Sequence, residues 1–485
     1  MTLMDPALWE GKINTGAWVA GSGGTQEVKE PATGAVLGQV GVATADDVYA
    51  AAIRAATVQK AWAATRPEDR AAVLRRAGTL FETHAEEIQR WIIREDGSTP
   101  PKAALETHIA ANECFDAAAL PHLPQGEVLA SNENRWSVAR RTPAGVVSVI
   151  APFNFPLILS IRAVAPALAL GNAVLLKPDP RTAVCGGVAL MRVFEEAGLP
   201  TGVLQLLPGG ADVGAAVVDA PEVDVVAFTG STGAGRAIGQ TCGRLLKRAH
   251  LELGGNNALI VLPGVDVEKA ASAAAFGSWM NSGQICMTTG RHIVHESVYD
   301  DYVAALVRKA EALTVGDPNT EDVALGPLID ERQTAHCVEI VNAAAAEGAT
   351  IAAGGTNEGR FFRPTVITDL DRENTAWRNE IFGPVAPVAK FRTLEEAVEL
   401  ANDSEFGLSI GILGEVSVAM ELADRLDAGK IHINEQTVSD ESMAAFGGTK
   451  NSGNGTRIGG ASVNVEAFTE TQWLTMRSQI ADYPF

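Results

Sequence analysis

Short apolar runs alternate with stretches of helical periodicity from residue 145 to residue 262. The apolar runs, which are rich in β-branched residues, cover 146–150, 173–176, 203–207, 223–228 and 258–262. The helical stretches cover about 157–169, 183–197, 211–218 and 234–247. Short buried runs between helices indicate parallel strands with helices on both faces. We therefore predict a doubly wound, Rossmann-like α/β sheet, which binds its ligand at the carboxyl ends of the strands.

A second alternation begins after about residue 265 and predicts a second α/β lobe. Its expected elements are a helix over 267–280, a strand over 291–295 and helices over 297–313 and 330–347. Before the first sheet, the alanine-rich segment 45–117 predicts two or three helices. The segments 122–147 and 464–485 are polar, extended and strand-like, and we expect them to pair with another subunit.

The composition of the chain indicates which partners it can bind and does not bear on its fold. The chain has 485 residues, and its 38 basic and 59 acidic side chains give a net charge of −21. A surface this acidic repels nucleic acid and anionic membranes, so we expect neither as a partner. The five cysteines lie far apart without a CxxC pair, which argues against disulfides and favours a reducing cytoplasm.

Residues 142–161 carry no charge, so we consider whether they form a membrane-spanning helix. Pro143, Pro152, Asn154 and Pro156 interrupt it, so no continuous apolar helix is expected. We interpret the stretch as a buried strand, a turn and the start of a helix. The N-terminal residues show no basic region followed by an apolar core, so we expect no signal peptide either.

Three segments carry candidate chemistry. The glycine-rich segment 228–235 follows a strand and opens a helix, where backbone N–H groups can hold a pyrophosphate, although such glycines more often only form the turn. Cys286 lies in a loop rich in Gly and Thr and is either a nucleophile or a small buried hydrophobe. Glu252, between two leucines, is either a buried general base or a surface carboxylate at a strand end. The scattered histidines, His292 and His295 included, predict no metal site.

These segments together resemble the NAD(P)-dependent aldehyde dehydrogenase superfamily over essentially the whole chain. The resemblance rests on PFNFP at 152–156, LKP at 176–178, FTGST at 228–232, LELGG at 251–255, GQIC at 283–286, EIFGP at 380–384, and FGG at 446–448 followed by Lys450, Ser452 and Gly453. The segments QICMT at 284–288, NEQTV at 434–438 and WLT at 473–475 are similar to the benzaldehyde and vanillin dehydrogenase branch of that family.

The resemblance implies a role for each matching residue. Cys286 matches the nucleophile, Asn154 and the Cys286 backbone N–H match the donors to the oxyanion, and Glu252 matches the base that activates the hydrolytic water. Cofactor contacts are implied for Lys177, Pro180, Gly210, Gly230, Ser231, Gly235, Leu253, Glu380 and Phe382. The walls of an apolar substrate tunnel are implied for Phe153, Phe155, Ile158, Leu159, Ile285, Met287 and Phe446.

Two positions depart from the family pattern. Many NAD-specific relatives carry a Glu three residues after the cofactor-binding lysine, where this chain has Pro180. Without a carboxylate to repel a 2′-phosphate, we expect NADP to be accepted beside NAD, or preferred. Phe153 stands where many relatives have Trp, which changes the pocket wall and leaves the chemistry unchanged. We assign Arg162 to a surface ion pair, with a contact to a ring hydroxyl or methoxy group of a substrate as the alternative.

The resemblance also implies a division of the chain and a function. Residues 1–121 and 144–254 are expected to bind NAD(P), residues 255–463 to form the catalytic domain, and 122–143 and 464–485 to be oligomerisation strands of a homodimer or homotetramer. The implied reaction is oxidation of an aromatic aldehyde, of the vanillin or benzaldehyde type, to the carboxylic acid. It proceeds through a thiohemiacetal, hydride transfer to NAD(P)⁺ and thioester hydrolysis. The alternatives are an aliphatic aldehyde or semialdehyde as substrate, a CoA-acylating relative, which Glu252 argues against, and a cofactor-binding protein without activity.

Overall fold

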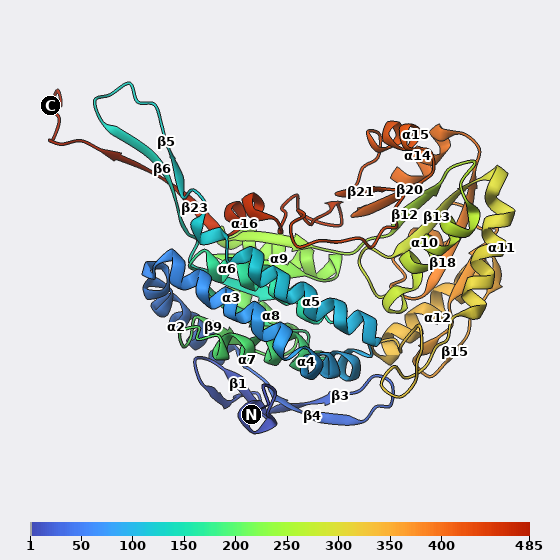
Figure 1. The fold of residues 1–485 in the computed structure, drawn as a ribbon, viewed down its shortest axis with the longest axis horizontal. Coiled ribbons are helices and arrows are strands. Elements are labelled where there is room, and N and C mark those ends of the chain that lie inside the picture. The colour runs from blue at the N-terminus through green and yellow to red at the C-terminus, as the bar shows by residue number, and fades with distance from the viewer. Residues whose placement is uncertain (1) are drawn as a thin grey trace.

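Residues 2–485 are described by a computed structural model, which contains two seven-stranded sheets and a three-stranded arm (Figure 1). The first sheet is built on five parallel strands, β7 (Val146–Ile150), β8 (Ala173–Lys177), β9 (Leu204–Leu206), β10 (Val225–Thr229) and β11 (Arg248–Glu252). Their spatial order is β11-β10-β7-β8-β9, and the antiparallel strands β1 (Lys12–Asn14) and β2 (Trp18–Ala20) extend the sheet beyond β9. This order is doubly wound and confirms the predicted Rossmann-like sheet.

Helices cover both faces of this sheet, as its fully buried central strands β7 and β8 require. They are α2 (Ala45–Ala64), α3 (Pro67–Thr83), α4 (Ala85–Trp91), the π-turn η1 (Ile92–Asp96), α5 (Pro100–Ala117), α6 (Pro156–Ala169), η3 (Val184–Val188), α7 (Ala189–Glu196), α8 (Ala211–Asp219) and α9 (Thr232–Leu245). The prediction of two or three helices over 45–117 was too low. Pro67 and Pro100 each begin a new helix there, because proline is compatible with the first helical turn and not with a helix interior.

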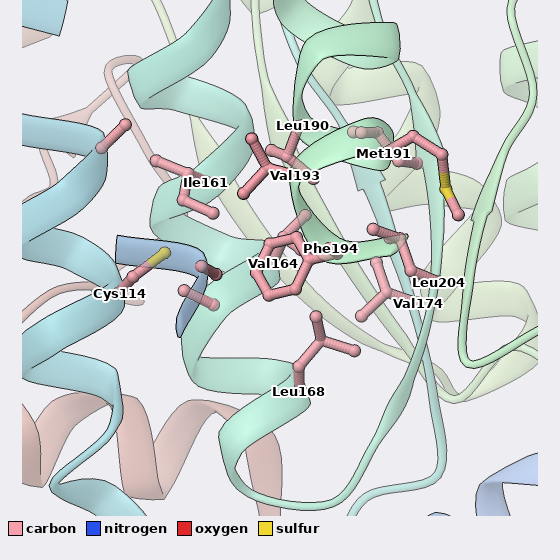
Figure 2. Close-up of a cluster of buried hydrophobic side chains, with 14 of the residues drawn as sticks. Cys114, Ile161, Val164, Leu168, Val174, Leu190, Met191, Val193, Phe194 and Leu204 are labelled. Carbon is pink, nitrogen blue, oxygen red and sulfur yellow. The ribbon is translucent and has the colours of Figure 1, made fainter. Parts of the chain in front are cut away.

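The largest apolar core lies between these helices and the sheet (Figure 2). α6 contributes Ile161, Val164 and Leu168, and α7 contributes Val193 and Phe194, all with no exposed surface. Fully burying side chains of this size is worth about 1.5–3 kcal/mol each. α6 is therefore a rigid support for the loop that precedes it.

The second sheet has the order β14-β17-β18-β13-β12-β20-β21. Its strands are β12 (Asn257–Val261), β13 (Thr289–His295), β14 (Thr350–Ala353), β17 (Thr365–Thr368), β18 (Val385–Phe391), β20 (Ser409–Leu413) and β21 (Lys430–Ile433). The helices around it are α10 (Val267–Trp279), η4 (Met280–Gly283), α11 (Glu296–Ala312), α12 (Glu331–Ala346), α13 (Thr375–Arg378), α14 (Leu394–Asn402) and α15 (Val416–Ala423). The helices predicted over 267–280, 297–313 and 330–347 are present.

One strand was assigned to the wrong sheet. The run 258–262 was counted with the first alternation, whereas β12 pairs in parallel with β13 and β20 of the second sheet. Only residues 253–256 separate β11 from β12. Parallel neighbours in one sheet need a crossover of a dozen residues or more, so this connection has to lead out of the first sheet.

The arm consists of β5 (Gly126–Val128), β6 (Trp136–Pro143) and β23 (Thr469–Met476), in the order β23-β6-β5, and it projects away from both sheets (Figure 1). The expected strands at 122–147 and 464–485 are thus present, except that 464–468 belongs to α16 (Ala461–Phe468). Shorter elements are α1 (Pro6–Trp9), β3 (Thr25–Lys29), β4 (Val36–Gly41), η2 (Leu120–His122), β15 (Asn357–Glu358), β16 (Phe361–Phe362), β19 (Phe406–Gly407) and β22 (Thr449–Lys450).

Residues 2–485 show neither a membrane-spanning helix nor a metal site. None of the helices there combines the length and the apolarity that crossing a bilayer requires. The uncharged stretch 142–161 forms the end of β6, β7, a loop and the first residues of α6, as interpreted from the sequence. The same described residues contain no group of His, Cys, Asp or Glu side chains arranged to hold a metal ion.

Candidate active site

The candidate site lies where the strand order of the first sheet reverses. β7 and β10 are neighbours there, although β8 and β9 separate them along the chain, and a crevice forms at the carboxyl ends of such a pair. β7 leads into the loop that contains Asn154, and β10 leads into Gly230 and Ser231. A cavity of about 720 Å³ opens at this point, and its wall includes Asn154 together with Cys286 from the second lobe.

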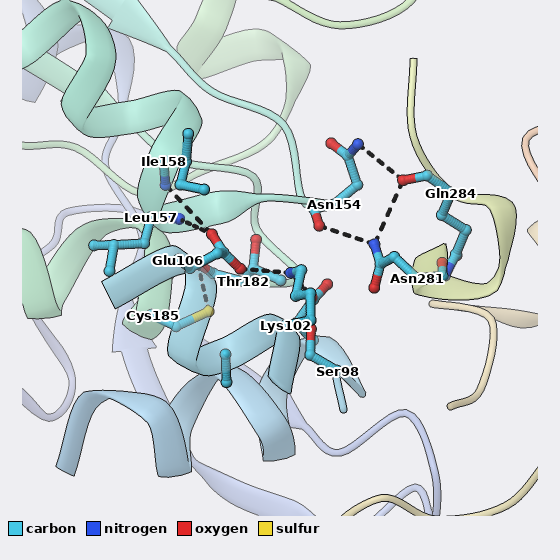
Figure 3. A network of polar contacts seen from close by, with 12 residues as sticks. Ser98, Lys102, Glu106, Asn154, Leu157, Ile158, Thr182, Cys185, Asn281 and Gln284 are labelled. Carbon is cyan, nitrogen blue, oxygen red and sulfur yellow. Dashed lines mark hydrogen bonds and ion pairs between the residues drawn. The ribbon is translucent and has the colours of Figure 1, made fainter. Parts of the chain in front are cut away.

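Asn154 is fixed by the loop that carries Cys286. Its side-chain Nδ2 donates to the backbone oxygen of Gln284 at 2.9 Å, and its own backbone oxygen accepts from Asn281 Nδ2 at 3.0 Å (Figure 3). Gln284 is anchored in turn, because its Oε1 accepts from the backbone N–H of Ile329 at 3.0 Å. An amide nitrogen carries two hydrogens, so one N–H of Asn154 remains for a ligand in the cavity.

A buried ion network holds the other side of the Asn154 loop (Figure 3). Glu106 Oε2 accepts from the backbone N–H groups of Leu157 at 3.0 Å and Ile158 at 3.3 Å, in the first turn of α6. Lys102 donates to Glu106 and, at 2.6 Å, to Asp96. A carboxylate is favoured at a helix N-terminus by the unpaired N–H groups and by the helix dipole. The network therefore fixes the start of α6 and the loop before it.

The backbone before Cys286 is strained. Asn281, Ser282 and Gly283 have φ values of 51°, 54° and 69° in succession, which lie in the left-handed region. Serine rarely adopts this conformation, and asparagine does so more readily. A Cβ atom at position 283 would lie 2.1 Å from the backbone oxygen of Gly383, so only glycine fits there. The loop that carries the cysteine is thereby held directly against the loop that follows Phe382.

Cys286 is half-buried, and its carbonyl oxygen accepts from Asn257 Nδ2 at 2.8 Å. Burial, assisted by the negative charge of Glu380 and opposed by Lys430, raises the pKa of the thiol to about 12. The thiolate is the reactive form of cysteine. Burial therefore favours the neutral thiol over the thiolate.

Glu252 lies at the end of β11 and is buried, with 5% of its surface exposed, so the surface alternative was wrong. Both of its carboxylate oxygens lack a hydrogen-bond partner within residues 2–485. Burial raises the pKa of this carboxyl well above its usual range. The structure does not bring Glu252 into the cavity that Cys286 lines. It places the side chain in a separate cavity of about 20 Å³, beside Arg162 and Phe446.

All predicted cofactor residues except Gly235 line one or both of two cavities. The two cavities share Ile150, Lys177, Asp179, Arg181, Phe228 and Arg332 in their walls. The 720 Å³ cavity is lined by Lys177, Gly230, Ser231, Leu253, Glu380 and Phe382. The second, of about 1070 Å³, is lined by Lys177, Pro180 and Gly210. Gly235 lines neither cavity; a Cβ there would lie 2.2 Å from Leu253 Cδ2, so this glycine lets α9 approach the leucine.

This elongated space fits a dinucleotide. Ser231 is the N-cap of α9, a 14-residue helix whose first N–H groups and dipole favour an anion. Lys177 is buried, and its desolvation lowers the pKa of the ammonium group. Glu380 accepts from the backbone N–H of Gly255 at 2.9 Å, and burial raises the pKa of its carboxyl to about 7. A buried cation, a helix N-terminus and a carboxylate are the groups that a pyrophosphate and two riboses call for.

The charged groups on either side of Pro180 line both cavities and were not predicted as site residues. Arg181 pairs with Asp179 at 2.9 Å and with Asp330 at 2.8 Å, and its guanidinium lies 4.2 Å from the centre of the Phe153 ring. Phe153 therefore faces Arg181, which lines both cavities. An Asp-x-Arg segment directly after a strand was a visible signal of a local ion pair, but its distant partner Asp330 could not be found from spacing.

The predicted substrate residues fall into two groups. Phe153 and Leu159 line the 720 Å³ cavity. Ile285, Met287 and Phe446 form a buried apolar cluster that also contacts Phe155 and Cys286, while Ile158 is buried in the first turn of α6. Arg162 was wrongly assigned to the surface: it is buried and paired with Glu113 and Asp440, because its position on α6 faces the protein interior.

A doubly wound sheet, a long two-part cavity at its switch point and a cysteine in the wall of that cavity are typical of dinucleotide-dependent oxidoreductases with a thiol nucleophile. Comparison with known proteins agrees. The family model "Aldehyde dehydrogenase family" matches residues 18–474. The chain is 60% identical over 486 residues to a vanillin dehydrogenase of Amycolatopsis sp., with 100% of both proteins covered. It is 46% identical over 480 residues to a benzaldehyde dehydrogenase [NAD(+)] of Pseudomonas putida, covering 99% of this chain and 98% of the relative.

A solved structure is similar in fold as well. It is a betaine aldehyde dehydrogenase from Staphylococcus aureus in complex with NAD⁺, with a TM-score of 0.95 and 28% identity, covering 99% of this chain and 97% of that one. The chain belongs to the aldehyde dehydrogenase family and is an oxidoreductase.

Proposed function

We propose that the protein oxidises an aromatic aldehyde of the vanillin or benzaldehyde type to the carboxylic acid, with NAD(P)⁺ as the cofactor. The observation that carries the proposal is that Cys286 and Asn154 line one cavity beside the apolar cluster of Ile285, Met287 and Phe446. Burying an aromatic ring against such side chains contributes a few kcal/mol to binding, about 1.5–3 for a phenylalanine-sized group. The two relatives reported above, a vanillin and a benzaldehyde dehydrogenase, support the substrate class.

Cys286 acts as the nucleophile in this proposal. The thiol first loses its proton to solvent in the cavity, the sulfur of the thiolate then bonds to the aldehyde carbon, and the carbonyl oxygen becomes the oxyanion of a thiohemiacetal. The free N–H of Asn154 and the backbone N–H of Cys286 donate to that oxygen, and one such donor is worth about 10²–10³ in rate. Because Asn281 and Gln284 hold Asn154 in place, the donor needs no reorganisation when the charge develops.

Lys177, Ser231 and Glu380 would hold the cofactor along the two-part cavity. When bound, NAD(P)⁺ supplies a hydride acceptor, so that the substrate carbon leaves this stage as a thioester of Cys286. Glu252 then takes a proton from water while the water oxygen bonds to the thioester carbon. The carbon–sulfur bond breaks, and the products are the carboxylic acid and the free thiol. Glu252 has to leave its small cavity, or reach the thioester through water, to do this.

A substrate panel tests the proposed reaction. Vanillin, benzaldehyde, a straight-chain aldehyde and succinic semialdehyde are each offered with NAD⁺ and with NADP⁺, and the absorbance of the reduced nicotinamide is followed. We expect the two aromatic aldehydes to give the highest kcat/KM. A preference for the straight-chain aldehyde or the semialdehyde would mean that the substrate is not an aromatic aldehyde. If no aldehyde leads to reduction of the cofactor, the proposed reaction is wrong.

Cofactor choice gives a separate prediction. Pro180 places no carboxylate beside Lys177, and Asp179 is already engaged by Arg181, so neither opposes a 2′-phosphate with a free negative charge. We expect kcat/KM with NADP⁺ to equal or exceed that with NAD⁺, and Pro180→Glu to lower the NADP⁺ value selectively. Steady-state kinetics with both cofactors test this. A preference of about a hundredfold for NAD⁺, worth nearly 3 kcal/mol, would contradict it.

The reactivity of the thiol gives another prediction. Because the pKa of Cys286 is raised to about 12, labelling by iodoacetamide in the absence of cofactor should keep rising with pH well past the ordinary thiol value of about 8.5. Glu380→Gln removes a negative charge that raises this pKa, so its labelling curve should move to lower pH. Intact-mass spectrometry reads the labelling, and Cys286→Ala identifies the site. If labelling of Cys286 already reaches its maximum at a pH at or below the ordinary thiol pKa, the pKa of this thiol is not raised and the prediction is wrong.

The division of the chain into domains, its assembly and its location are also part of the proposal. We propose that residues 1–121 and 144–254 bind the cofactor, that 255–463 supply the catalytic cysteine, and that the arm of β5, β6 and β23 joins copies of the chain into a homodimer or homotetramer. The arm exposes Trp136 and Trp473, at 65% and 62% of their surface, which favours burial against a partner. Light scattering during size-exclusion chromatography tests the assembly. We further propose a cytoplasmic location, which the five free cysteines favour.

A further inference from the structure

The small cavity beside Glu252 holds more than the candidate base. It measures about 20 Å³ and is lined by Glu252, Arg162, Leu159 and Phe446 among others. Most of its wall is apolar. A cavity of this size accommodates one water molecule where at least two polar partners line it. Glu252 from the end of β11 and Arg162 from α6 are the two charged side chains in its wall.

Both charged groups are buried and incompletely paired. The two carboxylate oxygens of Glu252 and Nη2 of Arg162 have no hydrogen-bond partner among residues 2–485, although the residues are only 5% exposed. Buried polar groups are nearly always satisfied by protein or by ordered water. A single water in this cavity would satisfy both sides at once, accepting from the guanidinium and donating to the carboxylate.

Arg162 is held rigidly in this position. Its Nε donates to Glu113 at 3.0 Å, its Nη1 pairs with Asp440 at 2.7 Å, and its guanidinium lies 5.2 Å from the centre of the Phe446 ring. Asp440 also pairs with Lys430 at 3.2 Å. Since three contacts fix the guanidinium, its unpaired Nη2 is a fixed donor.

Four charged side chains from separate elements act on the Glu252 carboxyl. Burial raises its pKa, and the positive charges of Arg457, Arg162 and Lys430 lower it, whereas Asp440 raises it further. Of these four, only Arg162 lines the cavity of Glu252.

We propose that Arg162 is a positioning residue for thioester hydrolysis, and that it holds the Glu252 carboxylate through one water in the small cavity and so keeps it ready to accept a proton. This inference rests on the proposed function. In the step concerned, Glu252 takes one proton from the hydrolytic water, the oxygen of that water bonds to the thioester carbon, and the sulfur leaves as a thiolate. The proton then passes from Glu252 to the thiolate, so that the carboxylic acid and the free thiol are the products and nothing is oxidised or reduced.

The test measures hydrolysis alone. Cys286 is benzoylated with p-nitrophenyl benzoate in the absence of cofactor, and the decay of the adduct is followed by intact-mass spectrometry from neutral to alkaline pH. Arg162→Met removes the positive charge, which favours the neutral carboxyl. We therefore expect the decay profile to move about one pH unit to the alkaline side, with slow hydrolysis at neutral pH that recovers at high pH.

Three further variants make the result specific. Arg162→Lys restores the charge and should bring the profile back toward that of the wild type. Asp440→Asn removes a negative charge that acts on Glu252 and should move the profile to lower pH, opposite to Arg162→Met. Arg192→Met is the matched control: Arg192 is buried on α7 and paired with Glu195 and Glu196, and it should leave the profile unchanged.

The outcomes separate the two proposals. Failure of the wild type to oxidise any aldehyde contradicts the proposed function itself. A wild type that works, combined with an Arg162→Met profile that keeps its pH midpoint and loses rate equally at every pH, means that Arg162 only supports the fold, and the inference is overturned. If Arg162→Met does not fold, Arg162→Gln, which also removes the charge and keeps a polar side chain, is measured in its place, and an unshifted profile overturns the inference.

Discussion

Replacing Cys286 with alanine should reduce aldehyde-dependent cofactor reduction to the background rate, a loss of about 10⁴-fold or more. The sulfur is the atom that is proposed to bond to the substrate carbon, and alanine leaves nothing that can form the thioester. Because the side chain is small and half-buried, the variant should fold and should bind NAD(P)⁺ like the wild type. Steady-state absorbance measures the turnover, and a thermal shift with cofactor measures the binding.

Cys114→Ala is the matched control for this variant. Cys114 is a free cysteine on α5 with no exposed surface. It lies in the wall of neither cavity. It should retain turnover and should still form an acyl adduct, which intact-mass spectrometry detects after an acid quench. Turnover that survives in Cys286→Ala, or an adduct on another residue, would remove Cys286 from the mechanism.

Glu252→Gln should separate the two halves of the reaction. Gln has the same shape and cannot accept a proton, so about one equivalent of reduced cofactor should appear per active site and the steady state should then fall by about 10²–10⁴-fold. The acyl adduct should accumulate on Cys286. Rapid-mixing absorbance gives the burst, and mass spectrometry gives the adduct. Loss of the burst together with the steady state would mean that Glu252 also takes part in the steps before hydrolysis.

The same variant should change stability in a pH-dependent way. The pKa of Glu252 is raised in the folded protein, so the stability it contributes is full below its ordinary value of about 4.3 and is lost as the pH rises toward the folded value. Gln carries no such penalty. The Tm of Glu252→Gln should therefore exceed that of the wild type by more at alkaline pH than at acidic pH, and an equal difference at all pH values would contradict the burial of a charge there.

The first sheet was predictable because its central strands are covered on both faces and read as unbroken apolar runs. β7 and β8 have this pattern, and each is followed by the residues that line the cavities. The sheet to which 258–262 belongs was not predictable from that pattern, since periodicity reports burial and not the neighbour. The short connection 253–256 between β11 and β12 was the sequence feature that indicated a change of sheet.

The candidate site was predictable only in part. The segments around Asn154 and Cys286 identify the residues, and the topology brings them to one cavity. The contacts that hold them were not predictable, because Asn281 and Glu106 act through distant partners that no spacing reveals. The position of Glu252 in a second cavity depends on the direction of one side chain, which a sequence pattern does not encode.

The tight approach of Gly283 to Gly383 has a consequence for anyone who redesigns this protein. A random library that includes position 283 would consist almost entirely of inactive clones, because every side chain there drives the loop of Cys286 away from the loop of Phe382. A library at Ile285 and Met287 instead changes side chains of the apolar cluster that Cys286 contacts. New substrates are best sought there, with the glycine left untouched.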